Sequence, residues 1–260
     1  MLVDSKQDAF STPNRMAAAT RSLLIDISNS FTKYALATAT KVGRIEKVPT
    51  AALTPELLKG AEKATTIVLS SVVPAAEKRL GRLLKGRKVI RVSAEVNLGV
   101  GIDYPNPAAI GADRLANAAS AAALYGCPCV VVDFGTAVTF DILSRDRKYL
   151  GGVIAPGLEA MTDYLHDRTA LLPKIDLSEP VGAIGKSTKD AMLAGAIYGY
   201  RGLVREILAQ IRRDLGSPRG LKIVATGGYA ELIAAKMPEI QTVHPGLTLE
   251  GLRIIGELNR

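Results

Sequence analysis

One pattern occurs twice in this chain, and it constrains the fold more than any other feature. The stretch "LLIDISNSFTKYAL" (residues 23–36) has an apolar run that ends in an acid, then small polar residues, then a second apolar run. The stretch "CVVVDFGTAVTFDIL" (129–143) repeats it, and Asp26 aligns with Asp133 at an offset of 107 residues. Each copy predicts a strand, a tight turn and a second strand. The same alignment pairs Ser28 with Gly135, Asn29 with Thr136 and Thr32 with Thr139.

The correspondence extends beyond these hairpins. Each half has a buried strand pattern followed by a helical pattern, and each has further strand patterns beside them. The strand patterns cover 65–74 and 221–230, 44–49 and 148–156, and 88–93 and 240–244, and the helical patterns cover 75–86 and 229–236. We therefore predict an α/β fold in which one mixed-sheet unit is duplicated. The predicted organisation is a flexible N-terminal extension at 1–21, a first domain at 22–110, and a second domain at 111–260 with additional helices at 113–125 and 188–215.

Charge and composition exclude several classes of protein. The formal net charge is +8, but the basic residues are scattered, and the densest run (78–91) carries leucines at helical spacing, which predicts a solvated helix face. Four Phe and no Trp leave few platforms for stacking bases, so we expect no nucleic-acid partner. No window approaches about 18 uninterrupted apolar residues, so we expect no membrane span. A mild positive charge suits a protein that binds small anions.

The cysteines and histidines offer no metal or disulfide framework. Cys127 and Cys129 lie in "GCPCVVVDFG", where they read as small residues entering a buried strand. This use of cysteine fits a reducing compartment, and we expect a cytoplasmic protein. His166 and His244 lie far apart without metal-ligand spacing, which argues against a zinc site.

The duplicated hairpins predict a particular kind of binding site. Two similar turns that face each other across a cleft offer backbone N–H groups and small hydroxyl groups to phosphate oxygens. Acids at the strand ends, Asp26 and Asp133, then point at the cation that accompanies the phosphates. The alternative is that each Asp only caps its turn. Two acids in matched contexts favour the nucleotide site.

A second motif lies between the two halves, within "GIDYPNPAAIGADRLANAASAAALYG" (101–126). Gly111 interrupts the preceding loop, and an alanine-rich helical run follows Arg114. Asp113 therefore lies in the first turn of a helix, where an acid is ordinarily a cap or a partner of the helix dipole. Taken alone, this position does not distinguish a structural from a chemical role.

From about residue 23 to its end, the sequence resembles the type III pantothenate kinases, which belong to the superfamily of actin, sugar kinases and heat-shock ATPases. The motifs that carry the resemblance occur in the family's order: "DISNS", "SSVVP", "DYPNP", "GADRLANA", "VVDFGTAVTFDIL", "YLGGVIAPGLEAM", "TALLP", "IGKSTKDAMLAG", "ATGGYA" and "LTLEGL". "GADR" followed by "DFGTAVTFD" and "LGGVIAPG" at these separations is highly specific. The resemblance implies two actin-like (ribonuclease H-like) mixed-sheet domains that flank a nucleotide cleft.

The resemblance also implies an activity: ATP-dependent phosphorylation of pantothenate to 4′-phosphopantothenate, the first step of coenzyme A biosynthesis. Asp113 would accept the proton of the substrate hydroxyl, and Asp133 would bind a monovalent cation, K⁺ or NH₄⁺. Magnesium would accompany ATP, and the enzyme would be a homodimer with its active site near the subunit interface. The implied pantothenate-binding residues are Tyr104, Gly111, Ala112, Asp113, Arg114 and Thr188. The implied ATP-binding residues are Asp26, Ile27, Ser28, Asn29, Ser30, Phe31, Thr32, Lys33 and Thr136.

Within this implied site, Arg114 can offer its fork of N–H donors to the pantothenate carboxylate. Without the resemblance, Arg114 would read equally well as a surface residue of a helix. Tyr104 would be an ordinary loop aromatic, and Thr188 an ordinary residue at a helix start.

One residue departs from the family pattern. The family's first turn usually reads Asp-x-Gly-Asn-Thr, whereas this chain has Ser28 at the glycine position. If that position requires a positive φ, serine there costs about 1 kcal/mol or more. Either the backbone at Ser28 is ordinary with the side chain turned away, or ATP binding is weakened. The second case would suit a non-catalytic regulatory relative of the transcription accessory factor type. A third hypothesis is another small-molecule kinase of the same superfamily.

Overall fold

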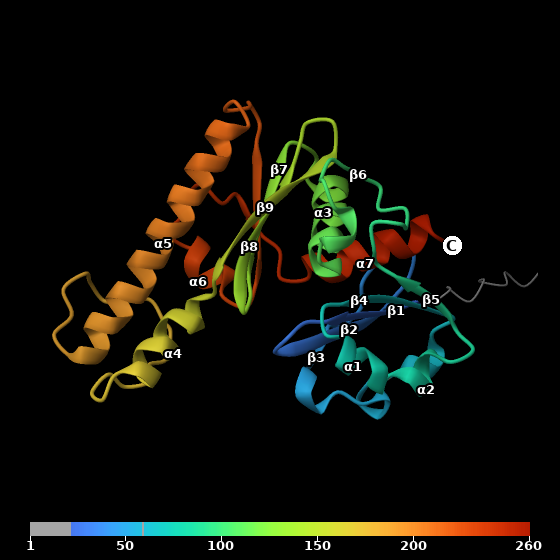
Figure 1. Cartoon of the computed structure of the whole chain (residues 1–260), viewed down its shortest axis with the longest axis horizontal. Coiled ribbons are helices and arrows are strands. Elements are labelled where there is room, and N and C mark those ends of the chain that lie inside the picture. Colours follow the sequence, from blue (N-terminus) through green and yellow to red (C-terminus); the bar gives the residue numbers. More distant parts are fainter. Residues whose placement is uncertain (1–21, 59) are drawn as a thin grey trace, which may run out of the picture.

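The computed structural model describes residues 22–58 and 60–260; the extension predicted at 1–21 lies outside the described residues. Two mixed β-sheets form the centres of two lobes (Figure 1). The first sheet has the order β3-β2-β1-β4-β5. Its strands are β1 (Ser22–Ile27), β2 (Phe31–Ala37), β3 (Glu46–Pro49), β4 (Thr66–Ser71) and β5 (Lys88–Arg91).

The second sheet repeats the arrangement of the first. Its order is β11-β10-β7-β8-β9-β6, so β9-β8-β7-β10-β11 corresponds to β3-β2-β1-β4-β5. In both sheets the first strand pairs antiparallel with the second and parallel with the strand that follows the hairpin unit. The strands are β6 (Gly101–Ile102), β7 (Cys129–Phe134), β8 (Ala137–Leu143), β9 (Lys148–Pro156), β10 (Lys222–Gly227) and β11 (Thr242–Val243). The predicted duplication of a mixed α/β unit is confirmed.

The strand register corrects one detail of the sequence alignment. Asp26 pairs with Lys33 across the first hairpin, whereas Asp133 pairs with Thr139 across the second. The first turn is therefore one residue longer, and Thr139 corresponds to Lys33, not to Thr32. An offset counted along the chain was wrong beyond the turn because it had no way to register the extra residue.

Helices fill the space between the sheets and cover their outer faces. The α-helices are α1 (Pro74–Arg79), α2 (Gly81–Leu84), α3 (Ala112–Leu124), α4 (Leu158–Arg168), α5 (Thr188–Asp214), α6 (Ala230–Ala234) and α7 (Leu247–Leu258). Short 3₁₀ helices are η1 (Thr50–Ala52), η2 (Pro55–Leu57), η3 (Ala61–Lys63) and η4 (Pro107–Ala109). The long predicted helices near 113–125 and 188–215 are confirmed, but the helical pattern at 75–86 forms two short helices that meet at Leu80.

Three hydrophobic clusters show how the layers pack. One lies between the sheets and includes α3 and α7, one lies under α5 and α6 on the second sheet, and one lies under α1 and the 3₁₀ helices on the first sheet. Figure 1 shows α3 and α7 between the two lobes. The helices approach closely because Gly251 of α7 has no side chain; a Cβ there would lie 2.0 Å from the carbonyl oxygen of Ala116.

Two elements cross the boundary predicted between residues 110 and 111. The short strand β6 precedes this point yet pairs with β9 of the second sheet. The helix α7 near the end of the chain contacts β1 and β4 of the first sheet. In the described part of the chain, no helix has the length and apolar character needed to cross a membrane.

Candidate active site

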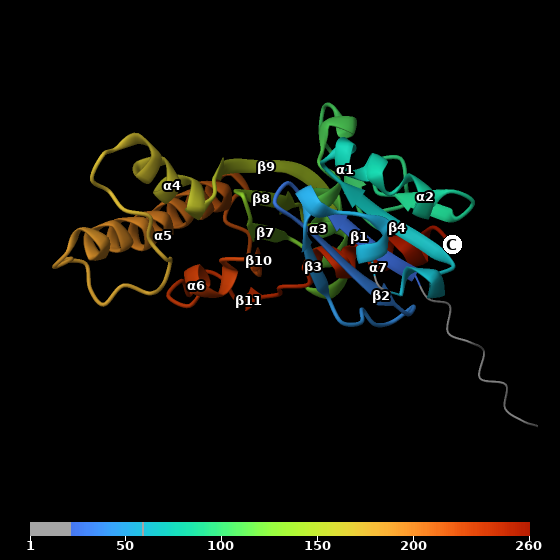
Figure 2. The same ribbon diagram turned by 90° about the horizontal axis from the view of Figure 1, so that it is seen from below.

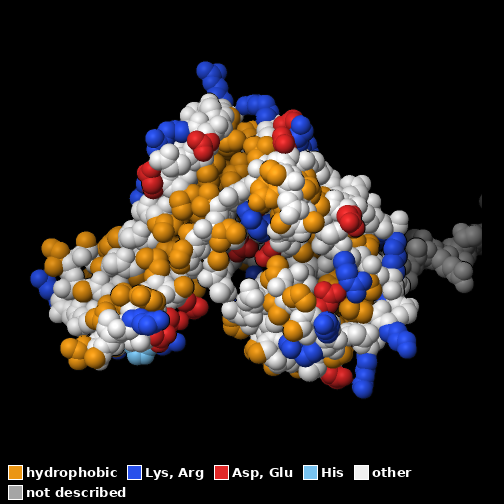
Figure 3. Space-filling view, in the orientation of Figure 1, with side chains coloured by type: hydrophobic (Ala, Val, Ile, Leu, Met, Phe, Trp, Pro, Cys, Tyr) orange, Lys and Arg blue, Asp and Glu red, His pale blue; other side chains and the backbone are white. Residues whose placement is uncertain are grey.

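Strand alternation aims the two hairpin acids at the space between the lobes. Leu24 of β1 and Val131 of β7 both belong to the cluster between the sheets. Asp26 and Asp133 each follow two residues later, and residues two apart on a strand share a face. Figure 3 shows acidic and basic side chains together in the hollow between the lobes. The pattern of the strands therefore creates the predicted arrangement of two acids facing one cleft.

The two hairpin turns meet in this cleft. The hydroxyl groups of Ser30 and Thr136 form a hydrogen bond of 3.0 Å, although they lie 106 residues apart in the chain. Thr136 is exposed, and so is the neighbouring Gly135. The two small-residue turns thus lie next to each other and are joined through their hydroxyl groups.

Asp26 is almost fully buried near the end of β1. Its side chain is 4% exposed, and its Oδ1 accepts a hydrogen bond of 3.0 Å from the Ser70 hydroxyl. Burial raises the pKa of Asp26 from 3.8 to about 7, and the nearby Asp113 adds to the rise, whereas the Ser70 hydrogen bond and Lys33 oppose it. A carboxyl group that is this difficult to ionise gains most from a cation or a cation-bound ligand beside it.

Ser28 does not strain the first turn. Among the described residues other than glycine, only Arg147 and Ser217 have positive φ, and Gly135 in the second turn has no positive φ either. The position therefore does not require glycine for its backbone. Of the two explanations for the serine, the ordinary backbone is confirmed, but the expectation that its side chain turns away is wrong. The Ser28 hydroxyl donates a 3.3 Å hydrogen bond to Oδ2 of Asp26.

Asp133 is held by an amide instead of hydroxyl groups. Nδ2 of Asn117 donates to Oδ2 of Asp133 at 3.1 Å, and the Thr248 hydroxyl donates to Oδ1 of Asn117 at 2.9 Å. The second bond fixes which end of the amide faces the acid. Burial raises the pKa of Asp133, while Lys33 and the Asn117 hydrogen bond lower it. Sequence reasoning missed Asn117, although it lies four residues after Asp113 and therefore on the same helix face.

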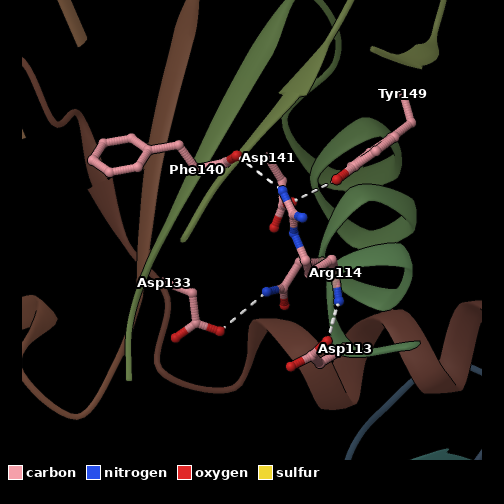
Figure 4. Close-up of polar contacts among 7 residues, drawn as sticks. Asp113, Arg114, Asp133, Phe140, Asp141 and Tyr149 are labelled. Carbon is pink, nitrogen blue, oxygen red and sulfur yellow. Dashed lines mark hydrogen bonds and ion pairs between the residues drawn. The ribbon is translucent and has the colours of Figure 1, made fainter. Parts of the chain in front are cut away.

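Asp113 enters the cleft from the first turn of α3. Its Oδ1 accepts the backbone N–H of Arg114 at 2.8 Å, and burial raises its pKa although Arg114 opposes the rise. Gly111 makes this geometry possible, because a Cβ there would lie 2.6 Å from the same Oδ1. Figure 4 shows the carboxyl groups of Asp113 and Asp133 beside one space, from α3 and β7 respectively.

Arg114 lies beside Asp113 and points toward the second sheet. Its Nε donates to Oδ1 of Asp141 at 2.6 Å, and one Nη donates to the carbonyl oxygen of Phe140 at 3.4 Å (Figure 4). The Tyr149 hydroxyl donates to the same Oδ1 at 3.1 Å. Burial raises the pKa of Asp141 to about 7 even though Arg114 and Tyr149 favour its ionised form. Asp141 was not among the predicted site residues.

The acids in the cleft fit a cation that keeps other ligands. In the described ranges, no three His, Cys, Asp or Glu side chains converge closely enough to ligate one metal ion by themselves. Asp26, Asp113 and Asp133 nevertheless influence one another's charge. Oxygen donors of this kind suit hard cations, and Mg²⁺ usually retains water and phosphate ligands in addition to one or two carboxylates.

Comparison with known proteins finds a matching family model and curated relatives of the same description. A family model described as type III pantothenate kinase matches residues 22–210. A type III pantothenate kinase of Akkermansia muciniphila is 50% identical over 242 residues, which cover 91% of this chain and 98% of the relative. A type III pantothenate kinase of Methylacidiphilum infernorum is 42% identical over 239 residues, which cover 91% of this chain and 88% of the relative.

The chain belongs to the type III pantothenate kinase family. A solved structure from Campylobacter jejuni, described as a Baf family transcriptional activator, superposes with a TM-score of 0.56 at 21% identity. The match covers 90% of this chain and 96% of that one. At this identity the likeness concerns the fold alone. It shows that the mixed α/β fold is shared over most of both chains.

The nucleotide-binding residues that the resemblance implies include two structurally distinct groups. Ser28, Ser30 and Lys33 lie at the cleft, beside Asp26 or the second turn. Ile27 packs in the core on the far face of the first sheet, and the buried Thr32 hydroxyl bonds that of Thr50 at 3.0 Å. These last two residues therefore support the turn from behind.

The pantothenate-binding residues that the resemblance implies lie in two separate places. Tyr104 is 39% exposed and lies edge-on to Tyr149, with its ring 3.4 Å from where a Cβ on Gly151 would be, so it lies on the Arg114 side of the site. Thr188 instead starts α5 and lines a pocket between α4 and α5. Figures 1 and 2 both place this end of α5 in the second lobe, away from α3. Within one chain, the structure does not bring Thr188 together with Tyr104 and Arg114.

Proposed function

We propose that this protein transfers the γ-phosphoryl group of ATP to the terminal hydroxyl of pantothenate, giving 4′-phosphopantothenate in the first step of coenzyme A biosynthesis. The observation that carries the proposal is the convergence of Asp26, Asp113 and Asp133 on one cleft beside two facing turns, in a chain of the type III pantothenate kinase family. A kinase of this family uses ATP with a divalent metal ion.

The chemistry assigns the proton to Asp113. The pantothenate hydroxyl oxygen attacks the γ-phosphorus, the bond from that phosphorus to the bridging oxygen breaks, and ADP leaves. The hydroxyl proton passes to the Asp113 carboxylate. Burial raises the pKa of this carboxyl group, which makes it a better proton acceptor near neutral pH than an exposed aspartate.

The rest of the cleft positions the phosphates. Phosphoryl transfer depends mainly on alignment and charge neutralisation. Ser30 and Thr136 supply hydroxyl groups from opposite turns, and Lys33 lies across the hairpin from Asp26. Magnesium bound with ATP neutralises charge on the phosphate oxygens. Asp26 is suited to the cation on the first side of the cleft, and Asp133 to the monovalent cation, K⁺ or NH₄⁺, on the second.

The pantothenate site lies on the far side of Asp113 from the turns. Gly111 and Ala112 begin α3, Arg114 is next in the chain, and Tyr104 stands beside the Gly151 backbone. In this proposal Arg114 binds the pantothenate carboxylate. That contact places the opposite end of the molecule, which carries the reacting hydroxyl, toward Asp113.

We also propose a homodimer in which α4 and α5 meet a second copy. These helices border an apolar pocket of about 880 Å³ that includes Thr188. Large apolar side chains around it are exposed, among them Tyr164 at 62% and Leu171 at 89%. Contiguous exposed apolar surface of this kind marks interaction sites. A partner copy could supply Thr188 to the site from which it is separated within one chain.

The two free cysteines suit a reducing compartment, and we place the enzyme in the cytoplasm. A non-catalytic regulatory relative is not favoured, because Asp26, Asp113 and Asp133 are all in place and Ser28 leaves the turn unstrained. Another small-molecule kinase of the superfamily is separated from the leading proposal by a substrate panel.

The test is a coupled assay of ADP release with folded protein, Mg-ATP and KCl, with and without pantothenate. We expect ADP formation that depends on pantothenate and falls when sodium replaces potassium. ATP binding without pantothenate-dependent turnover would contradict the enzyme proposal and support the regulatory relative. Turnover with another acceptor only would support a different kinase.

A further inference from the structure

We propose that Asp141 is a positioning residue for substrate recognition: it holds Arg114 so that the outer edge of the guanidinium group receives the carboxylate of the substrate. The proposal rests on the proposed function, in which Arg114 binds the pantothenate carboxylate. Asp141 itself is too deeply buried to touch the substrate, since its side chain is 0% exposed.

One oxygen of Asp141 accepts both of its side-chain hydrogen bonds. Its Oδ1 accepts from Nε of Arg114 at 2.6 Å and from the Tyr149 hydroxyl at 3.1 Å. The tyrosine ring also lies beneath the guanidinium group, with the Arg114 Cζ 5.8 Å from the ring centroid. The guanidinium group is thus fixed at its inner edge by an ion pair and along one face by a ring.

The donors left over on Arg114 define what it can bind. An arginine side chain has five N–H donors in a planar fork. Nε is used by Asp141 and one Nη2 hydrogen by the carbonyl oxygen of Phe140, and the described residues provide no partner for Nη1. The Nη1–Nη2 edge is therefore available, and its spacing matches the two oxygens of a carboxylate. The side chain is 16% exposed, which limits access to a narrow opening.

The backbone of β9 makes room for this arrangement. A Cβ on Gly152 would lie 2.2 Å from Nη2 of Arg114 and 1.9 Å from the Phe140 carbonyl oxygen, so a larger residue would displace both groups. The adjacent Gly151 has φ +128° and leaves space for the ring of Tyr104. Both glycines of "YLGGV" thus serve the surroundings of one guanidinium group.

The second oxygen of Asp141 argues against a purely stabilising role. Its Oδ2 is buried and has no hydrogen-bond partner among the described residues. An incompletely satisfied buried carboxylate lowers stability, and buried ion pairs are commonly no more stabilising than apolar side chains of similar volume. Compared with an apolar pair of similar volume, the Asp141–Arg114 pair therefore adds little stability, but it gives Arg114 a defined orientation.

The experiment compares two substrates in variants of the full-length enzyme. Asp141→Asn keeps the shape of the side chain and removes its charge. The substrates are pantothenate and the analogue in which a primary alcohol replaces the carboxylate. We expect the variant to lose at least tenfold in kcat/KM for pantothenate, through a higher KM; a tenfold change corresponds to about 1.4 kcal/mol. The KM for ATP and the kcat/KM for the alcohol should change by less than about twofold.

Two further variants keep the outcome decisive. Tyr149→Phe removes one hydrogen bond to Asp141 and should give a smaller loss with the same selectivity, which serves if Asp141→Asn folds poorly. Asp146→Asn, on the exposed turn of the same hairpin, is the matched control and should change nothing. Equal losses for both substrates, or an unchanged KM for pantothenate, would overturn the positioning role.

Arg114→Gln separates this proposal from the function on which it rests. If Arg114→Gln lowers kcat/KM for pantothenate much more than for the alcohol, while Asp141→Asn lowers both equally or neither, only the positioning role of Asp141 fails. If Arg114→Gln affects both substrates equally, the assignment of the carboxylate site to Arg114 fails. Absence of pantothenate turnover in the unmodified enzyme would overturn the proposed function itself.

Discussion

Asp26 and Asp133 occupy the same position in two equivalent hairpins, but different groups hold them. Asp26 is buried and receives hydroxyl hydrogen bonds from Ser28 and Ser70. Asp133 is half-buried and receives one amide hydrogen bond from Asn117. The duplicated backbone therefore sets where the acids lie, while non-equivalent neighbours set how each one binds a proton or a cation.

The turns that follow the acids differ as well. The first is one residue longer, and it carries a serine where the second carries a glycine. Because neither position has a positive φ, this difference concerns space at the cleft and not backbone strain. A repeat of the fold thus permits the two sides of a nucleotide site to specialise.

The largest effect on activity is expected at Asp26. Asp26→Asn should lower kcat by about a hundredfold or more, as loss of a preorganised electrostatic group commonly does. The stability of this variant should instead rise at neutral and higher pH. Because burial raises the pKa of Asp26 to about 7, the folded protein binds this proton more tightly than the unfolded chain, so stability falls as pH rises from about 4 to about 7.

The variant removes this penalty and should be more stable than the unmodified protein at pH 8, by at most about 4 kcal/mol at about 1.4 kcal/mol per pKa unit. Urea unfolding at pH 8 and pH 4 measures it, and the difference should shrink toward pH 4. Asp167→Asn, on the exposed surface of α4, is the control. A less stable Asp26→Asn protein at pH 8 would contradict the account of the buried acid.

Asp133→Asn should have a smaller effect on rate and a specific effect on ion dependence. We expect roughly tenfold lower turnover in KCl and little further loss when sodium replaces potassium, because the proposed ligand of the monovalent cation has lost its charge. The measurement is turnover against KCl concentration at constant ionic strength. An unchanged response to potassium would place the cation elsewhere.

Thr248→Val tests how Asn117 makes the second hairpin differ from the first. The change removes the hydroxyl that fixes the Asn117 amide and leaves the buried Oδ1 without its donor. We expect a loss of about 1 kcal/mol in the free energy of unfolding and a few-fold higher potassium concentration for half-maximal activity. If only stability fell, the link from α7 to Asp133 would be structural alone.

The smallest effects are expected at the turns themselves. Ser28→Gly makes the first turn resemble the second and should leave kcat within about threefold, with a small loss of stability from backbone entropy of about 0.5–1 kcal/mol. In Gly135→Ala, the added Cβ would lie 3.4 Å from the Ala137 carbonyl oxygen, an ordinary contact. Its melting temperature should therefore not fall, because alanine also lowers the backbone entropy of the unfolded chain. A higher KM for ATP would report phosphate approach at this turn. A large gain in activity for Ser28→Gly would show that the serine does weaken the site.

The sequence predicts what depends on local pattern. Alternating and buried apolar runs locate both hairpins, and Asp26 and Asp133 align because each ends such a run. The register beyond the first turn was wrong because one extra residue leaves no trace in the apolar pattern. The split at Leu80 also escaped prediction, because the leucines continue at helical spacing across it.

The partners of the acids were harder to predict for a different reason. The Asn117–Thr248 hydrogen bond joins residues 131 apart in the chain, and it exists only because α3 and α7 pack against each other. No local pattern encodes that packing. Asp141 did leave a signal, since an acid between Phe140 and Ile142 interrupts the apolar end of a strand. Thr188 was assigned by family resemblance alone, and its distance from α3 within one chain is not readable from the sequence.

The central claim is that the two hairpins align ATP for attack by a hydroxyl whose proton Asp113 accepts. The most direct measurement is transfer of an isotopically labelled γ-phosphoryl group from ATP to pantothenate, followed by mass spectrometry, for the unmodified enzyme and Asp113→Asn with ATP binding checked in both. We predict labelled 4′-phosphopantothenate from the unmodified enzyme and at least about a hundredfold less from the variant, which still binds ATP. Labelled product at an unchanged rate from Asp113→Asn would contradict the account.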